Sequence, residues 1–164
     1  MTKINLIATG GTLDKHYSAI TGTLDVDDPV LHKVLADAGV GPEELTVSSF
    51  LRKDSLDITP DERADLAEFV ASAPASRVLI THGTDTMGET AELIARLAPG
   101  KTVVLTGAMV PYKVESSDAA FNIGFAYAAV QLLPPGVYIA MHGRVLPHAQ
   151  YRKVREIGRF VPSK

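Results

Sequence analysis

The stretch that decides the fold is residues 4–12, which read Ile-Asn-Leu-Ile-Ala-Thr-Gly-Gly-Thr. A short, nearly continuous apolar run is typical of a central strand in a parallel sheet, buried on both faces. Two glycines end the run, and a threonine follows at once. Residues 78–86 repeat this plan as Val-Leu-Ile-Thr-His-Gly-Thr-Asp-Thr. Because open α/β sheets bind ligands beyond the carboxyl ends of their strands, we expect both threonine-bearing loops at one functional edge.

The rest of the chain alternates between strand and helix patterns. Strands are predicted at residues 3–8, 45–51, 77–81, 102–105 and 137–141. Helices are predicted at residues 29–38, 60–72, 86–97 and 116–132. Thr59, Pro60 and Glu62 give the second helix a capping box with proline at its first position. This alternation predicts an α/β fold with a single doubly wound, mostly parallel sheet and helices on both faces.

Two segments show no regular pattern. Residues 9–28 read as a long polar loop, and loops of this length without structure of their own are often functional. Residues 142–164 are polar, basic and irregular. The chain contains no internal repeat or low-complexity segment, so we predict one domain over residues 1–164.

Composition limits the classes of function. The 164 residues are 46% hydrophobic and 21% charged, which suits one domain with its own core. A net charge of -3 argues against a nucleic-acid surface, and the absence of cysteine excludes disulfides and thiolate chemistry. No stretch has the roughly 18 apolar residues of a membrane span, and the N-terminus shows no signal peptide. We therefore expect a cytoplasmic protein that binds neither nucleic acid nor membrane.

Several familiar motifs are absent. No Gly-x-Gly-x-x-Gly follows the first strand, and no Gly-x-Ser-x-Gly or His-Glu-x-x-His occurs. Residues 83–90 approach P-loop spacing, but Glu89 stands where the phosphate-binding lysine belongs. His142 and His148 suit surface or hydrogen-bonding roles better than metal chelation. We predict no metal and no cofactor.

The remaining chemistry is that of threonine hydroxyls. A threonine is a poor nucleophile unless a base takes its proton. One candidate activator is Tyr17, in the same loop as Thr12. The other is Lys153, because burial near Asp85 could tune the acidity of its ammonium group. Lys153 could also complete a set with Thr84 and Asp85.

Loop amides around Gly10 and Gly11 could form an oxyanion hole. A Thr-Gly-Gly-Thr sequence also occurs in ordinary tight turns, so the spacing by itself leaves a structural role for this loop open.

Taken in order, these motifs resemble the N-terminal domain of the bacterial-type L-asparaginase/glutaminase amidohydrolases. Residues 8–12 and 82–86 carry the resemblance, which covers essentially the whole chain. Weaker agreement follows in the same order at residues 54–57, 106–109, Pro111, 117–119, Asn122 and 136–137.

The resemblance implies roles for individual residues. Thr12 matches the nucleophile that attacks the side-chain amide carbon and forms an acyl-enzyme ester. Thr84, Asp85 and Lys153 match a second set, in which lysine and aspartate organise the threonine and the aspartate receives the substrate's α-ammonium.

Further positions match substrate-binding residues of the family. Ser55 matches the residue that holds the α-carboxylate, and Gly11 and Gly83 line the substrate site. Tyr17 matches a lid tyrosine, although it lies only five positions after Thr12, closer than is usual. Leu56 stands where a polar, substrate-facing residue is common.

The family's second domain has no counterpart after Lys153. We therefore expect a single-domain form, in which self-association into a homo-oligomer covers the cleft. The predicted reaction is hydrolysis of L-asparagine or a related small amide to the acid and ammonia. The alternatives are an inactive amino-acid-binding module with the same cleft, or a piece of a longer enzyme.

Each predicted site residue also has a purely structural interpretation. Thr12 and Ser55 could serve as turn hydroxyls, and Thr84 with Asp85 could cap the helix at residue 86. Lys153 could be an exposed member of a basic tail, and Tyr17 an ordinary loop aromatic.

Overall fold

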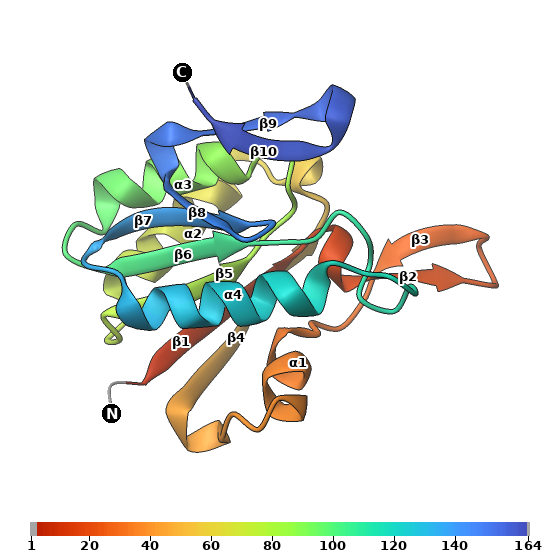
Figure 1. Cartoon of the computed structure of the whole chain (residues 1–164), viewed down its shortest axis with the longest axis horizontal. Helices are drawn as coiled ribbons and strands as arrows, with labels where there is room; N and C mark the ends of the chain where they lie inside the picture. Colours follow the sequence, from red (N-terminus) through yellow and green to blue (C-terminus); the bar gives the residue numbers. More distant parts are fainter. Residues whose placement is uncertain (1–2, 164) are drawn as a thin grey trace.

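A computed structural model describes residues 3–163 of the chain. Six strands form a central sheet in the order β4–β1–β5–β6–β7–β8 (Figure 1). Their bounds are β1 Ile4–Gly10, β4 Leu45–Lys53, β5 Arg77–Thr81, β6 Thr102–Thr106, β7 Gly136–Met141 and β8 Arg144–Pro147. The first five of these run parallel, and β8 pairs antiparallel with β7. The predicted mostly parallel α/β sheet is confirmed.

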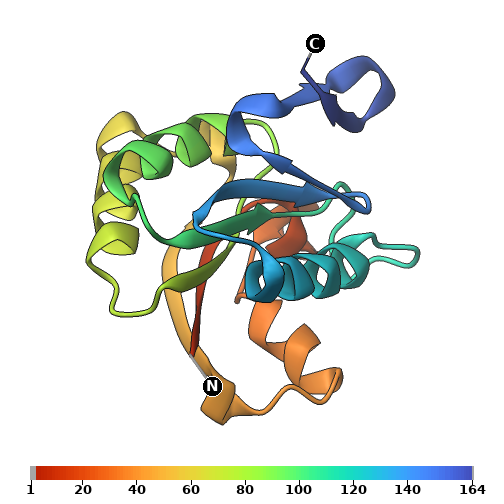
Figure 2. The same ribbon diagram turned by 60° about the vertical axis from the view of Figure 1, so that its left-hand side comes forward.

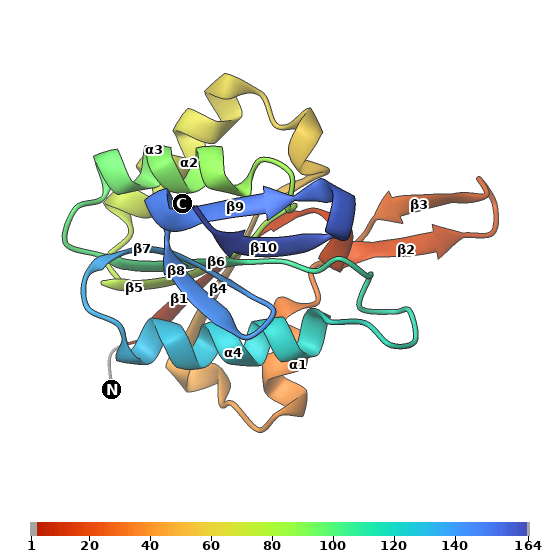
Figure 3. The ribbon, with the colours of Figure 1, turned by 45° about the horizontal axis from the view of Figure 1, so that its top comes forward.

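Helices cover both faces of the sheet (Figure 3). α1 (Leu31–Asp37) and α4 (Ala119–Leu132) pack on one face, and α2 (Pro60–Ser72) and α3 (Met87–Leu97) on the other. Successive strand residues serve the two cores in turn, since Leu6 faces α1 and α4 whereas Ile7 faces α2 and α3. Burial on both faces explains why the strands read as continuous apolar runs. Within residues 3–163, the helices are all too short or too polar to cross a bilayer.

The helix starts follow local hydrogen bonding. The predicted capping box is confirmed: Glu62 N–H donates to Thr59 Oγ1 at 3.2 Å, and Thr59 N–H donates to Glu62 Oε2 at 2.9 Å. The predicted start of α4 at residue 116 is wrong, because the helix begins at Ala119. The Asp118 carboxylate accepts the backbone N–H groups of Met109 and Val110 in the loop after β6 at 3.0 Å, and it makes no capping bond to a backbone N–H group of α4.

The loop predicted at residues 9–28 contains regular structure. A 3₁₀ turn (Thr12–Asp14) leads into β2 (Lys15–Ser18), which pairs antiparallel with β3 (Thr23–Val26). This hairpin projects from the body of the molecule (Figure 1). Its strands are four residues long and carry mostly polar, partly exposed side chains, so they lack the apolar pattern that predicts a strand.

The basic segment at residues 142–163 also contains regular structure. Beyond β8 it forms β9 (Tyr151–Val154) and β10 (Arg159–Pro162), an antiparallel hairpin outside the central sheet (Figure 2). Phe160 is buried and stacks on Tyr151 with ring centroids 4.9 Å apart. These two aromatic residues anchor the hairpin. The rest of the segment has the pattern of a charged tail, which explains why the sequence analysis did not predict its strands.

Candidate active site

The strand order of the sheet selects one position for a cleft. The parallel strands β4, β1, β5, β6 and β7 lie side by side, so the chain moves to one side from β1 and to the other side from β5 onward. The strand order therefore reverses between β1 and β5, and open α/β sheets bind ligands beyond the carboxyl ends of the strands at such a point. The two threonine motifs follow these two strands.

Glycines allow three loops to touch at this edge. A Cβ atom on Gly11 would lie 2.5 Å from both Cα and N of Gly83, and Gly11 has a φ of +83° that favours glycine. A Cβ atom on Gly83 would lie 2.6 Å from Cβ of Ser55. The loops that carry Thr12, Thr84 and Ser55 are therefore in backbone contact. A part for the two glycines in substrate binding stays a prediction.

The second predicted set is assembled by β9. Lys153 Nζ donates to Thr84 Oγ1 at 2.8 Å and to Asp85 Oδ1 at 2.9 Å. Thr84 is 7% exposed, and the Lys153 side chain is 14% exposed. Thr84 and Asp85 do not cap α3, because this helix begins at Met87 and its N-cap residue is Thr86. Lys153 likewise is not an exposed tail residue.

Asp85 has a second cationic partner, which the sequence analysis did not identify. Arg155 lies with its Nη2 atom 3.1 Å from Asp85 Oδ1, the same oxygen that accepts the Lys153 bond. The signal that could have found it is closeness in sequence, because Arg155 lies two positions after Lys153, at the start of the 3₁₀ turn that follows β9. Once Lys153 is placed, Arg155 becomes the next candidate.

Thr12 has a less constrained environment. It starts the 3₁₀ turn and is half-buried, and its hydroxyl makes no hydrogen bond to another residue of the described range 3–163. One of the loop amides predicted for an oxyanion hole already has a partner. Gly11 N–H donates to the Lys53 carbonyl at 2.8 Å, so this amide is already used in holding the loop against β4.

Within residues 3–163, neither the Tyr17 nor the Ser55 side chain forms a hydrogen bond to Lys153, Thr84 or Asp85. Tyr17 is 67% exposed on the projecting hairpin, opposite Leu24. Ser55 is 1% exposed, and its hydroxyl is closed to solvent with no hydrogen-bond partner in residues 3–163. A substrate would reach that hydroxyl only if its turn or the adjoining Gly83 peptide shifted. Their roles therefore stay predictions.

A buried hydrogen-bond chain supports the loop after β5. His82 Nδ1–H donates to the Gly83 carbonyl at 2.7 Å, so Nε2 accepts from the Thr90 hydroxyl at 2.9 Å. Arg63 in turn donates to Thr90. Burial lowers the pKa of His82 to about 4, and the nearby Arg63 charge acts in the same direction. The neutral ring therefore fixes the peptide that precedes Thr84.

A cleft of about 640 Å³ opens beside these loops, between the projecting hairpin and the end of β4. Asp85 and Leu56 both line this cleft, and Leu56 is 63% exposed. Lys15 Nζ lies 2.6 Å from Asp54 Oδ2 and joins the loop of Thr12 to that of Ser55. This hydrogen bond is the main reason that the pKa of Asp54 lies below its ordinary value.

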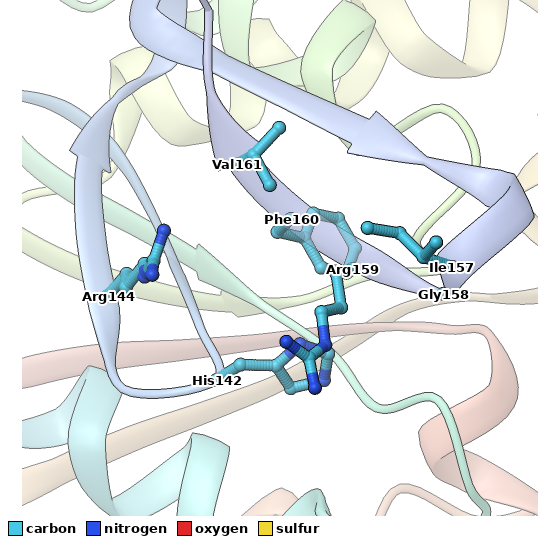
Figure 4. A pocket seen from close by; sticks show the side chains of 7 residues that line it. All are labelled: His142, Arg144, Ile157, Gly158, Arg159, Phe160 and Val161. Atoms are coloured by element: carbon cyan, nitrogen blue, oxygen red, sulfur yellow. The ribbon is translucent and has the colours of Figure 1, made fainter.

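A second hollow, of about 550 Å³, lies between the turn before β8 and strand β10 (Figure 4). His142, Arg144, Arg159 and Phe160 line it. It contains none of the predicted site residues, and it is separate from the threonine loops. Within residues 3–163, no three His, Asp or Glu side chains are arranged to hold a metal ion.

The fold agrees with comparisons to known proteins. A family model described as "Asparaginase, N-terminal" matches residues 3–159. The L-asparaginase of Thermococcus kodakarensis is 30% identical over 165 residues, which cover 95% of this chain and 49% of that protein. The structure of the thermostable L-asparaginase from Thermococcus kodakarensis is similar with a TM-score of 0.84 at 27% identity, over 98% of this chain and 51% of that one.

A different relative is similar over a shorter span. This relative, one of the subunits of the glutamyl-tRNA(Gln) amidotransferase of Pyrobaculum aerophilum, is 38% identical over 144 residues, which cover 80% of this chain and 33% of that protein. The chain thus spans about half the length, or less, of the curated relatives that it matches. Because the family model extends over nearly every described residue and includes both threonine motifs, the chain belongs to the asparaginase family, in the part that corresponds to the N-terminal domain.

Proposed function

We propose that this chain carries the catalytic groups of an amidohydrolase, which cleaves L-asparagine or a related small amide to the acid and ammonia. The observation that carries the proposal is the bonding of Lys153 to both Thr84 and Asp85 at the edge where the Thr12 loop also lies. Family membership supports the reaction class. The substrate, the nucleophile and the activity are our proposals.

The proposed reaction has two steps. Thr12 Oγ1 attacks the amide carbon and gives up its proton, and the carbon–nitrogen bond then breaks as the leaving nitrogen takes up that proton and departs as ammonia. Water next attacks the resulting ester, which releases the acid and restores the hydroxyl of Thr12. No metal or cofactor takes part in this scheme.

The environments of the two hydroxyls favour this division of roles. The Thr84 hydroxyl already accepts a hydrogen bond from Lys153, and it is nearly buried. Thr12 is half-buried and has no such partner within residues 3–163. We therefore assign Thr12 as the nucleophile and the Thr84–Lys153–Asp85 set as the group that orients the substrate and moves protons.

Ammonia release by the wild type, Thr12→Ala and Thr84→Ala tests the proposal. We expect both variants to lose activity by a factor on the order of 10³ or more. In quenched reactions, mass spectrometry should place the acyl group on the peptide that contains Thr12. If calorimetry showed asparagine binding while the wild type released no ammonia, the alternative of an inactive binding module would be supported instead.

The amidotransferase relative favours a second candidate function. This relative is 38% identical, and its name describes one subunit of a larger enzyme. The second candidate for this chain is therefore an amide-cleaving subunit that works with a partner. The same assay with glutamine separates the two candidates, because a pocket can distinguish glutamine from asparagine by about 1–3 kcal/mol through the one extra methylene of glutamine. Self-association of this chain also stays a prediction.

A further inference from the structure

Asp85 is shared by two cations in this structure. Lys153 Nζ lies 2.9 Å from Asp85 Oδ1, and Arg155 Nη2 lies 3.1 Å from the same oxygen. Two positive charges against one negative charge leave this corner of the site positive. We infer that Arg155 determines specificity, and that it sets the site for amides that carry a carboxylate but no ammonium beside it. This inference rests on the proposed function.

The hairpin geometry holds Arg155 in position. In the β9–β10 hairpin Lys153 pairs with Phe160, which is buried and stacks on Tyr151. Arg155 begins the 3₁₀ turn that joins the two strands, and Gly158 closes that turn with a φ of +58°. The anchor that places Lys153 on Thr84 therefore also places Arg155 on Asp85.

The other acidic groups of the cleft do not offset this excess of positive charge. Asp54 is paired with Lys15 at 2.6 Å. Asp25 lies on the projecting hairpin, where the hydroxyls of Thr21 and Thr23 donate to its carboxylate at 3.1 Å and 2.9 Å. Asp57 also lines the cleft, but it forms no ion pair with Lys153 or Arg155 within residues 3–163.

The consequence concerns the substrate's amino group. The α-ammonium of asparagine or glutamine would approach Asp85 against two resident cations, both of which lie on its Oδ1 atom. The monoamide of succinic acid has the same length, amide and carboxylate as asparagine but lacks that ammonium. Leu56, an apolar side chain that is 63% exposed and lines the same cleft, likewise offers no hydrogen bond to an amino group. Monoamides of dicarboxylic acids, and asparagine whose amino group is acylated, fit this corner better.

The test compares kcat/KM for succinamate and for L-asparagine in the wild type, Arg155→Gln and Arg155→Lys. We expect the wild type to favour succinamate. Arg155→Gln should shift the ratio about fivefold toward asparagine, mainly through KM, as befits a partly exposed charge pair. Arg155→Lys keeps the charge and should keep the ratio. Arg155 is largely exposed, so these variants should fold.

Arg152→Gln is the matched control, because Arg152 is an exposed residue of β9 that forms no ion pair within residues 3–163. Its ratio should equal that of the wild type. A wild type that cleaves asparagine better than succinamate, or an unchanged ratio in Arg155→Gln, would overturn the inference.

Failure of the proposed function gives a different result. In that case the wild type would release no ammonia from any of the amides. Calorimetry with succinate and L-aspartate then still decides the inference, since the wild type should bind succinate more tightly and Arg155→Gln should narrow the difference. Equal preference in both proteins would overturn it.

Discussion

The loops after β1 and β5 share one local plan, a buried strand followed by glycine and threonine, yet their threonines have different environments. Thr84 is nearly buried, and its hydroxyl accepts a hydrogen bond from Lys153, 69 residues further along the chain. Thr12 is half-buried and lacks a partner within the described residues. Similar local sequence thus produces one constrained hydroxyl and one unconstrained hydroxyl, because distant segments supply the partners.

The buried ionisable residues beside the two threonines also differ, because one is an acid and the other is a base. Asp14 follows Thr12 by two positions and accepts the Val30 backbone N–H at 2.9 Å. Burial raises the pKa of Asp14 to about 6. His82 precedes Thr84 by two positions, and burial lowers its pKa to about 4. Both sites favour the neutral form, one of an acid and one of a base.

The substitution with the largest expected effect disrupts the contact between the Thr12 and Thr84 loops. Gly11→Ala should cost about 3 kcal/mol or more of unfolding free energy, since the new Cβ adds a clash with the Gly83 backbone to the strain of positive φ. Gly100→Ala is the matched control: its φ is +88°, and nothing lies within 4 Å of the added atom. It should cost only about 1–2 kcal/mol in urea unfolding. Equal losses would contradict the loop contact.

The next effect sharpens the comparison of the buried residues through pH. Stability from neutral Asp14 is fully present below its ordinary pKa of 3.8 and is lost as pH rises through about 6. Stability from neutral His82 is present above its ordinary pKa of 6.5 and is lost as pH falls through about 4. Each contribution amounts to up to about 3 kcal/mol, and the two oppose each other in the wild type.

Variants separate these contributions in urea unfolding at pH 4, 5, 6 and 7. Relative to the wild type, Asp14→Asn should gain stability as pH rises, because it lacks the cost of ionising a buried carboxyl. His82→Gln should gain stability as pH falls, because it removes the base that takes up a proton on unfolding. Two variants whose unfolding free energies follow the wild type in parallel would show that neither residue titrates as described.

The smallest effect concerns the tie between the Thr12 and Ser55 loops. Lys15→Met should cost about 1 kcal/mol or less, because the Lys15–Asp54 pair is partly solvent-accessible. The pKa of Asp54, measured by NMR titration, should rise toward its ordinary value once its main hydrogen-bond partner is lost. Lys33→Met removes a more exposed pair with Asp37 and should leave Asp54 unaffected. An unmoved Asp54 pKa in Lys15→Met would contradict the tie.

Local patterns predicted the framework of this molecule correctly. The apolar runs that became β1 and β5 were readable because strands buried on both faces have no polar alternation. The capping box at Thr59 and Glu62 was readable because its hydrogen bonds join residues three apart. The β2–β3 hairpin was not readable, since short, partly exposed strands carry no apolar signal.

Neighbouring residues are enough to specify the layered α/β framework, the two glycine–threonine motifs and the edge of the sheet at which they lie, because these follow from strand burial and short-range spacing. Which side chains meet at that edge depends on packing between distant segments. Contact between the Gly11 and Gly83 backbones, and the delivery of both Lys153 and Arg155 to Asp85, join parts far apart in the chain. Such contacts follow from how the sheet and the β9–β10 hairpin pack, which no local pattern encodes.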